Sequence, residues 1–390
     1  MLCTIAFAQE AKDETFRAYW DNGIKIESAD ERFKIALGGR IHYDLAFFFQ
    51  DAATKEAIDT LRNGTEFRRV RLYNSGQLFN FLKYKVQVDF AGGKVAFKDV
   101  YIAFSKIPVI GTLTVGQFKE PLRLEVLTGS NYITFMERSS LVDLNTERNN
   151  GIMISNEAFK SRLGWQIGGF RNADAAGNDT KAGDRINVTG RISGLPCRKE
   201  EKKRLLHLGL GYSYRIFDGQ DFQVKLRPGS HLSPEYLDLT VKGIDDIHVL
   251  VPEAAWVKGP FSLQTEYLQA FVHSNLDSIG NYKMNSFYGQ VSYFITGERR
   301  NYKNPNSGFD RTKPEKNLGK DGCGAWEVAA RYSRVDLNTN NVEGGEMQSV
   351  TVGLNWYLNP VSRIMLNYTL AKLKSIGNTH ILATRFQIDF

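Results

Sequence analysis

Long hydrophobic runs are missing from this chain of 390 residues. No stretch approaches the ~18–20 apolar residues that a membrane-spanning helix requires, which excludes helical membrane proteins. Membrane β-barrels are not excluded, because their strands alternate between apolar and polar residues and therefore look polar on average. The mean hydropathy of −0.34 is compatible with that class.

Cysteine and histidine are also scarce, with three and six residues. Cys3 falls in a predicted leader, and Cys197 and Cys323 stand at no metal-binding or redox spacing, so one disulfide is possible but not expected. No two histidines stand at the spacing of helical metal ligands. We therefore predict no metal site and no cofactor.

The charge balance gives little support for a nucleic-acid partner. There are 50 basic and 43 acidic residues, a net charge of +7, which is typical of a mixed solvated surface. No zinc-finger, P-loop or aromatic-basic RNA-binding motif accompanies this small excess. We expect no nucleic acid among the partners.

The first residues have the pattern of a secretory leader. Leu2–Ala8 is an apolar run that ends in small-x-small residues, as before a signal-peptidase cut. We interpret residues 1–8 as the remnant of a signal peptide and residues 9–31 as a polar periplasmic segment. The alternative is an ordinary buried strand at the N-terminus.

The rest of the chain, residues 32–390, shows strand periodicity. In FRRVRLYNSGQLF, Val70 and Leu72 fall on one face, opposite Arg69, Arg71 and Tyr73. Similar patterns recur about every 20–25 residues, and we count sixteen, an even number as a closed bacterial barrel requires. If lipid covers the apolar faces, closure pairs every backbone group and the polar faces line a lumen. The predicted fold is an all-β, closed, antiparallel transmembrane β-barrel in an outer membrane.

The chain ends on an alternating strand, ILATRFQIDF. Its terminal Phe390 resembles the signal by which outer-membrane barrels are recognised for assembly. We therefore expect the barrel-assembly machinery and outer-membrane lipid among the partners.

Several connections are long, among them residues 119–149, 217–246 and 297–321. Counting strands from a periplasmic N-terminus places residues 297–321, which are strongly basic, on the periplasmic side, where turns are normally short. We interpret this segment as a long basic periplasmic turn; the alternative is that two strands have been missed.

Basic residues dominate the predicted lumen. Five acidic residues also face inward, and a low-dielectric wall focuses the excess of positive charge and concentrates anions. The alternative is a lumen of mixed charge without a sharp preference. The inward basic residues are Arg69, Arg71, Lys83, Lys85, Arg185, Arg191, Arg215, Arg331, Arg363 and Arg385.

Three blocks, FRRVRLYNSGQLF, YKVQVDFAGGKVAFKDVYIAF and GTLTVGQFKEPLRLEVLTGSNYITFMERS, resemble the phosphate-selective porin O and P family. The resemblance covers residues 33–390 and implies a sixteen-stranded homotrimeric barrel whose third loop, residues 119–149, folds into the pore. It also implies passive diffusion of inorganic phosphate or other small anions along a ladder of basic residues.

On positions that match the family, the resemblance assigns the ladder to Arg69, Arg71, Lys83 and Lys85. It assigns the constriction of the pore to Lys119, Arg123, Arg138 and Arg148. We add Arg191 and Arg331, from the inward basic residues, to the anion pathway. The same loop also carries five acidic residues, so its net charge is −1 and part of it serves to hold the loop in shape.

Three alternatives stay open at this point. The first is a general porin with weak ion selectivity. The second is a barrel enzyme, for which no spacing links a nucleophile, a base and an orienting group, so we predict no enzymatic activity. The third is a secreted soluble β-protein that binds glycans or ions.

Overall fold

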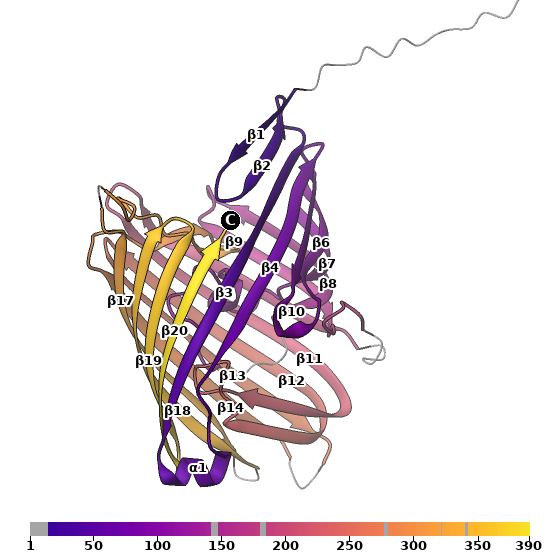
Figure 1. Cartoon of the computed structure of the whole chain (residues 1–390). Coiled ribbons are helices and arrows are strands. Elements are labelled where there is room, and N and C mark those ends of the chain that lie inside the picture. Colours follow the sequence, from indigo (N-terminus) through magenta and orange to yellow (C-terminus); the bar gives the residue numbers. More distant parts are fainter. Residues whose placement is uncertain (1–14, 142–146, 180–184, 277–279, 321, 340–341) are drawn as a thin grey trace, which may run out of the picture.

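Sixteen antiparallel strands form the wall of a barrel in the computed structural model (Figure 1). The structure describes residues 15–141, 147–179, 185–276, 280–320, 322–339 and 342–390. The strand number and the closed form agree with the prediction. The wall strands are β3 (Lys34–Gln50), β4 (Gly64–Leu78), β5 (Leu82–Asp89), β6 (Ala96–Ile107), β7 (Gly111–Phe118), β8 (Asn149–Ala158), β9 (Leu163–Arg171), β10 (Asn187–Lys199), β11 (Arg204–Leu226), β12 (Leu237–Lys258), β13 (Phe261–Ser274), β14 (Tyr282–Phe294), β17 (Ala325–Thr339), β18 (Val342–Asn359), β19 (Ser362–Leu373) and β20 (Gly377–Asp389).

The barrel closes where the last strand pairs with the first strand of the wall. β20 runs antiparallel to β3 from Arg40, opposite Asp389, to Gln50, opposite Thr379. Beyond the strand end, Phe390 and Gly39 exchange a further pair of backbone hydrogen bonds. Because of this seam, the sheet leaves no edge along the length of the wall.

The two faces of each strand separate as the sequence alternation predicts. Arg69 and Arg71 of β4 point inward and are only 3% and 6% exposed, whereas Leu72 points outward and is 52% exposed. Along the other strands, isoleucine, leucine, valine and aromatic residues likewise make up the exposed outer face. Buried polar side chains face the bore along much of the wall, and a buried apolar cluster that includes Ile247, Val249 and Leu337 also faces inward. This is the pattern of a wall with lipid outside and polar groups inside.

The two ends of the barrel differ in the length of their connections. Turns of two or three residues join β4 to β5, β6 to β7 and β12 to β13 at one end, here called the turn end. The opposite end, the loop end, carries longer connections, including α1 (Ala52–Ile58) between β3 and β4. Figure 1 shows α1 at the far end of the barrel from the C-terminus.

The long connection predicted at residues 217–246 is mostly strand, which corrects that expectation. β11 continues to Leu226 and β12 already begins at Leu237, so both project beyond their neighbours at the loop end. The register of β11 against β12 shifts between Ile216 and Gln220, so the turn-like residues Asp218 and Gly219 lie in a bulge and the strand continues. Such bulges allow a strand to continue through residues that normally end it.

Two additional hairpins lie outside the wall count. β1 (Phe16–Trp20) pairs with β2 (Ile24–Ser28), and β2 extends the sheet beside the start of β3, within the segment predicted only as polar. β15 (Asn301–Asn304) and β16 (Gly308–Asp310) form a separate two-stranded sheet between β14 and β17. The segment 297–321 therefore does hold two unpredicted strands, but neither belongs to the wall. The predicted signal peptide lies outside the described residues.

Among the residues that the structure describes, no helix is long and apolar enough to span a membrane. Cys197 and Cys323 are both free thiols.

The seam permits a direct test of the closure. A Cβ at Gly38 would lie closer to the Phe390 carbonyl oxygen than any real contact allows, so we expect Gly38→Ala to push the two strands apart. The free energy of unfolding should fall by about 1–3 kcal/mol, as for other overpacked sites. Urea unfolding of the protein in lipid vesicles, followed by tryptophan fluorescence, measures the change.

Gly289 of β14 provides the control, because a Cβ there meets nothing within 4 Å. Gly289→Ala should leave the unfolding midpoint in place. Equal stability of the two variants would contradict the tight seam.

Candidate functional site

The segment between β7 and β8 turns into the bore instead of crossing the loop end. We call residues 119–148 the inner loop; the structure describes it except for residues 142–146. Five of its apolar side chains are almost fully enclosed by the wall and by the loop itself. They are Leu122, Leu124, Ile133, Phe135 and Leu141, each 2% exposed or less.

The inner loop contains one short helix, α2 (Leu124–Leu127), whose first backbone N–H groups are held by the wall. The backbone N–H of Leu124 donates to Glu253 Oε2 of β12 at 2.7 Å, and that of Glu125 donates to Glu266 Oε1 of β13 at 2.6 Å. Carboxylates stabilise helix N-termini because the free N–H groups there carry partial positive charge. Two of the inward acidic residues thus fix the helix start.

The carbonyl end of α2 is held by two cations. Lys119 Nζ donates to the carbonyl oxygens of Val126, Leu127 and Thr128. Arg138 Nε donates to Glu125 O at 2.9 Å, and its Nη2 reaches Val126 and Thr128. Charged side chains therefore hold this four-residue helix at both ends. A helix this short is not stable in isolation, so these contacts stabilise it.

Arginines of the wall hold the rest of the inner loop by its backbone. Arg331 of β17 donates to Glu137 O at 3.0 Å and Arg363 of β19 to Ile133 O at 3.0 Å. Arg385 of β20 donates to Met136 O and makes a two-point ion pair with Asp44. These inward arginines are anchors, because each donates a hydrogen bond to a backbone carbonyl of the inner loop.

A cavity of about 660 Å³ lies between the inner loop and the turn end. Nine cationic side chains line it, against four carboxylates. The cations are Lys25, Arg40, Arg71, Lys85, Lys119, Arg138, Arg148, Lys303 and Arg311, and the carboxylates are Asp21, Asp99, Asp310 and Asp389. Lys85 and Arg148 both pair with Asp99, at 2.7 and 2.8 Å.

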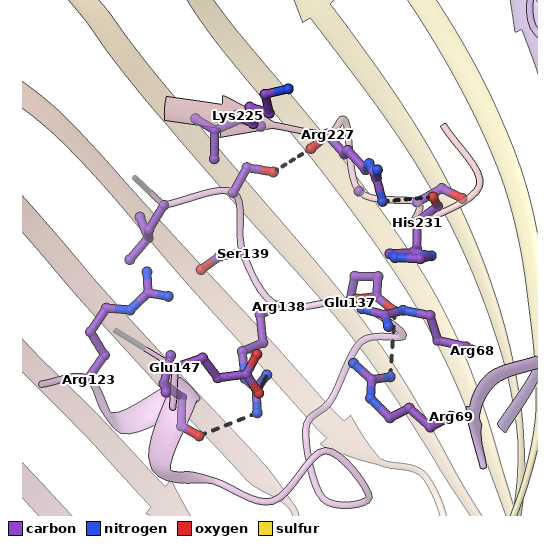
Figure 2. Close-up of a pocket in the computed structure, with 16 residues that line it drawn as sticks. Arg68, Arg69, Arg123, Glu137, Arg138, Ser139, Glu147, Lys225, Arg227 and His231 are labelled. Atoms are coloured by element: carbon purple, nitrogen blue, oxygen red, sulfur yellow. Dashed lines mark hydrogen bonds and ion pairs between the residues drawn. The ribbon is translucent and has the colours of Figure 1, made fainter. Parts of the chain in front are cut away.

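A second cavity, of about 220 Å³, lies between the inner loop and the loop end (Figure 2). It is lined by six basic side chains, Arg68, Arg69, Arg123, Arg138, Lys225 and Arg227, together with Glu137 and Glu147. Arg138 lines both cavities and therefore stands at the junction between them. Figure 2 shows the loop carrying Glu137, Arg138 and Ser139 between Arg69 on one side and Arg123 on the other.

Arg123 differs from the other basic residues of this cavity because it makes no ion pair within the described part of the chain. The side chain is 6% exposed, and among the residues that the structure describes neither Nε nor Nη1 has a hydrogen-bond partner. A buried guanidinium with free N–H groups is costly unless another group satisfies it.

Glu137 is the main counter-charge of the smaller cavity. It makes a two-point pair with Arg68, at 2.9 and 3.0 Å, and accepts from Arg385 Nη2 at 2.7 Å. Burial raises the pKa of the Glu137 carboxyl, but the charges of Arg68, Arg69 and Arg385 outweigh burial and hold the pKa well below its usual range. This residue stays ionised and tempers the positive charge around it.

The amino-acid sequence of this chain matches a known protein family. The family described as "Phosphate-selective porin O and P" matches residues 35–390. The chain belongs to that family. It is therefore an outer-membrane channel and not an enzyme, and its turn end is the periplasmic end.

Relatives of this porin show how far the likeness extends. Porin O from Pseudomonas aeruginosa is 26% identical over 92% of this chain and 87% of its own length. An uncharacterised protein from Caulobacter vibrioides is 30% identical over 95% of this chain and 76% of its own length. A solved structure titled "Anion-selective porin from Comamonas acidovorans" shares the fold, with a TM-score of 0.57 and 15% identity over 92% of this chain and all of that one.

The residues that the sequence assigned to an anion pathway fall into two groups in this porin. Arg69, Arg71, Lys85, Lys119, Arg123, Arg138 and Arg148 line one or both cavities. Lys83 is exposed near the turn after β4 and lines neither. Arg191 and Arg331 also line neither, because Arg191 is paired with Glu253 and donates to Pro305 O, while Arg331 anchors the inner loop.

Sequence reasoning missed several cations of the two cavities. Strict alternation assigns Arg68 to the outer face of Val70 and Leu72, but a β-bulge opposite His42 and Tyr43 leaves it as an extra residue that also turns inward. Arg40 precedes the apolar Ile41 on β3, so the alternation along this strand could have predicted that Arg40 faces the bore. Arg227 and Arg311 come from connections, where no periodicity indicates direction.

The anchors of the inner loop can be tested separately from conduction. Removing the Arg331 hydrogen bond to Glu137 O costs about 1.5–3 kcal/mol locally, as for other bonds to charged groups. Arg331→Ala should therefore speed amide hydrogen exchange in residues 122–141 by about tenfold or more. Mass spectrometry of the purified protein in detergent measures this rate.

Arg334→Ala is the matched control, because Arg334 lies on the same strand but pairs with Asp336 and Glu346 away from the loop. It should leave exchange in the inner loop unchanged. An unchanged rate in Arg331→Ala would contradict the anchoring role.

Proposed function

We propose that this porin conducts small anions passively across the outer membrane, with phosphate or phosphate-like anions as the preferred class. The observation that carries the proposal is the charge of the larger cavity, where nine cationic side chains stand against four carboxylates. A bore walled by low-dielectric material focuses such an excess and raises the local concentration of anions. The family description supports this class of solute.

The proposed path runs from the loop end through the smaller cavity, past Arg138, and into the larger cavity. An anion that enters beside Arg68 and Arg69 meets the free N–H groups of Arg123 next. Beyond Arg138 it meets Arg148 and Lys85. Each residue replaces part of the hydration shell of the anion, and the succession of sites lets it move on.

The preference for phosphate rests on the kind of cation in the path. Seven of the nine cations that we place along it are arginines, whose planar guanidinium matches a pair of phosphate oxygens. They are Arg40, Arg68, Arg69, Arg71, Arg123, Arg138 and Arg148. Lys85 and Lys119 add compact point charges. A general anion channel would share the charge but would bind phosphate no better than chloride.

Planar-bilayer recording of the wild-type protein tests the proposal. In a potassium chloride gradient, we expect the reversal potential to have the sign of an anion-selective channel. Addition of phosphate should then reduce the chloride current at concentrations well below that of chloride, because phosphate occupies the same sites for longer. A cation-selective reversal potential would refute the proposal, and anion selectivity without phosphate block would leave a general anion porin.

Arg123 gives a sharper test because, among the described residues, it makes no ion pair, unlike the other basic residues of the smaller cavity. We expect Arg123→Gln to weaken phosphate block by about tenfold, as for the loss of one charge-assisted hydrogen bond of ~1.5 kcal/mol. Lys55→Gln in α1, an exposed change of equal charge at the loop end, serves as control and should leave the block unchanged. Equal block in wild type and Arg123→Gln would remove Arg123 from the path.

A further inference from the structure

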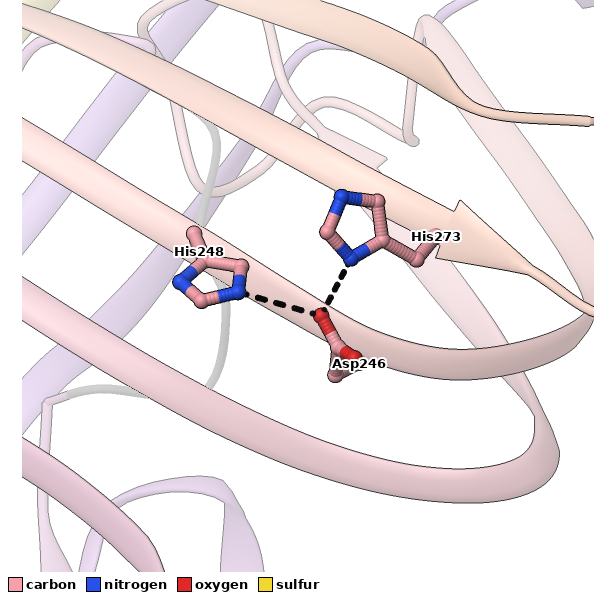
Figure 3. Close-up of side chains that lie close together, drawn as sticks. All are labelled: Asp246, His248 and His273. Atoms are coloured by element: carbon pink, nitrogen blue, oxygen red, sulfur yellow. Dashed lines mark hydrogen bonds and ion pairs between the residues drawn. The ribbon is translucent and has the colours of Figure 1, made fainter.

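Asp246, His248 and His273 form a cluster on the outer face of the barrel (Figure 3). In β12 the side chains of Ile247 and Val249 are fully buried and face inward, so Asp246 and His248 face outward. His273 of β13 lies directly opposite Asp246 in the antiparallel register. Period-two alternation and strand pairing together bring the three residues to one patch.

The patch lies just beyond the apolar band, toward the extracellular end. Leu208, Leu210 and Tyr212 form the exposed outer face of the neighbouring strand β11, and Tyr214 follows them opposite His248. β12 continues from Asp246 toward the loop end, away from its short turn with β13. The cluster is therefore at the extracellular rim and outside the bore.

The three side chains already converge on one point. His273 Nδ1 lies 2.7 Å from Asp246 Oδ1, and His248 Nε2 lies 3.4 Å from the same oxygen. All three ligand atoms lie within 4.8 Å of one another. Ligands of a tetrahedral Zn²⁺ stand about 3.4 Å apart, given bonds of about 2.1 Å. Small rotations of half-exposed side chains suffice to reach that spacing.

The ring of His248 is oriented by its neighbours. Its Nδ1 lies 2.7 Å from the Tyr212 hydroxyl, and its ring packs against that of Tyr214 at 4.8 Å between centroids. The tautomer that carries its proton on Nδ1 donates to the Tyr212 oxygen and leaves the Nε2 lone pair directed toward Asp246. Support of this kind on the far nitrogen is typical of histidines that bind metals.

We propose that Asp246, His248 and His273 bind a divalent transition-metal ion of the Zn²⁺ class at the extracellular rim. Two imidazoles and one carboxylate are a donor set suited to Zn²⁺, Cu²⁺ or Ni²⁺. Ca²⁺ and Mg²⁺ instead require six or more oxygen ligands, which this cluster does not supply. The three residues leave a further coordination position open to water or to an external ligand, as in zinc sites with three protein ligands.

Metal binding should be measured on the purified, tag-free protein in detergent by isothermal titration with Zn²⁺. We expect saturable binding of one Zn²⁺ per chain, undiminished by an excess of Mg²⁺ or Ca²⁺. His273→Ala should abolish this binding, and Tyr212→Phe, which removes the support of His248, should weaken it about tenfold. Cu²⁺ as a spectroscopic probe should show coupling to two nitrogens in its paramagnetic resonance spectrum.

His380→Ala is the matched control. His380 is an exposed outer-face histidine whose Nδ1 also lies beside a tyrosine hydroxyl, that of Tyr368 at 2.6 Å, but it is not part of the cluster. This variant should bind Zn²⁺ like wild type. Zn²⁺ binding that survives His273→Ala, or a wild type that does not bind Zn²⁺, would overturn the proposal. Because the cluster lies outside the bore, either result is independent of anion conduction.

Discussion

The pairing of backbone groups in hydrocarbon is the constraint on which the rest of this structure depends. An N–H or carbonyl group left unpaired in lipid costs several kcal/mol, so a sheet can cross the membrane only when it closes. The seam between β3 and β20 provides that closure. Once the sheet is closed, every strand has one face in lipid and one in the bore, and the long polar side chains of the second face have only the bore to occupy.

Charge then organises the bore. Isolated buried ions are expensive, and the inward arginines therefore appear in two settings. On β17, β19 and β20 they are bonded to loop carbonyls, to Asp44 or to Glu137, and they fix the inner loop. On β3 and β4 and in the loop itself they line the cavities. The anchors make the loop rigid enough for the second group to keep a defined spacing.

The sequence predicts the wall well and the contents of the bore only in part. Alternation places Arg69 and Arg71 inside and Leu72 outside because a strand has only two faces. It does not predict Arg68, whose direction depends on a bulge set by β3. It also does not distinguish Arg331, an anchor, from Arg71, a cavity residue. The difference is the hydrogen bond from Arg331 to Glu137 O of the inner loop, about 200 residues away in the chain. Likewise, Asp246 and His273 become neighbours only through the register between two strands.

The bulge at Arg68 shows how one extra residue in a wall strand changes the charge of the bore. One inserted residue turns a second guanidinium into the bore beside Arg69 while the number of strands and the lipid-facing surface stay the same. Insertions and deletions within a wall strand can therefore adjust the permanent charge of a pore in single steps. Related barrels can therefore differ in their preference for anions or cations through the gain or loss of a single codon, as well as through point substitutions.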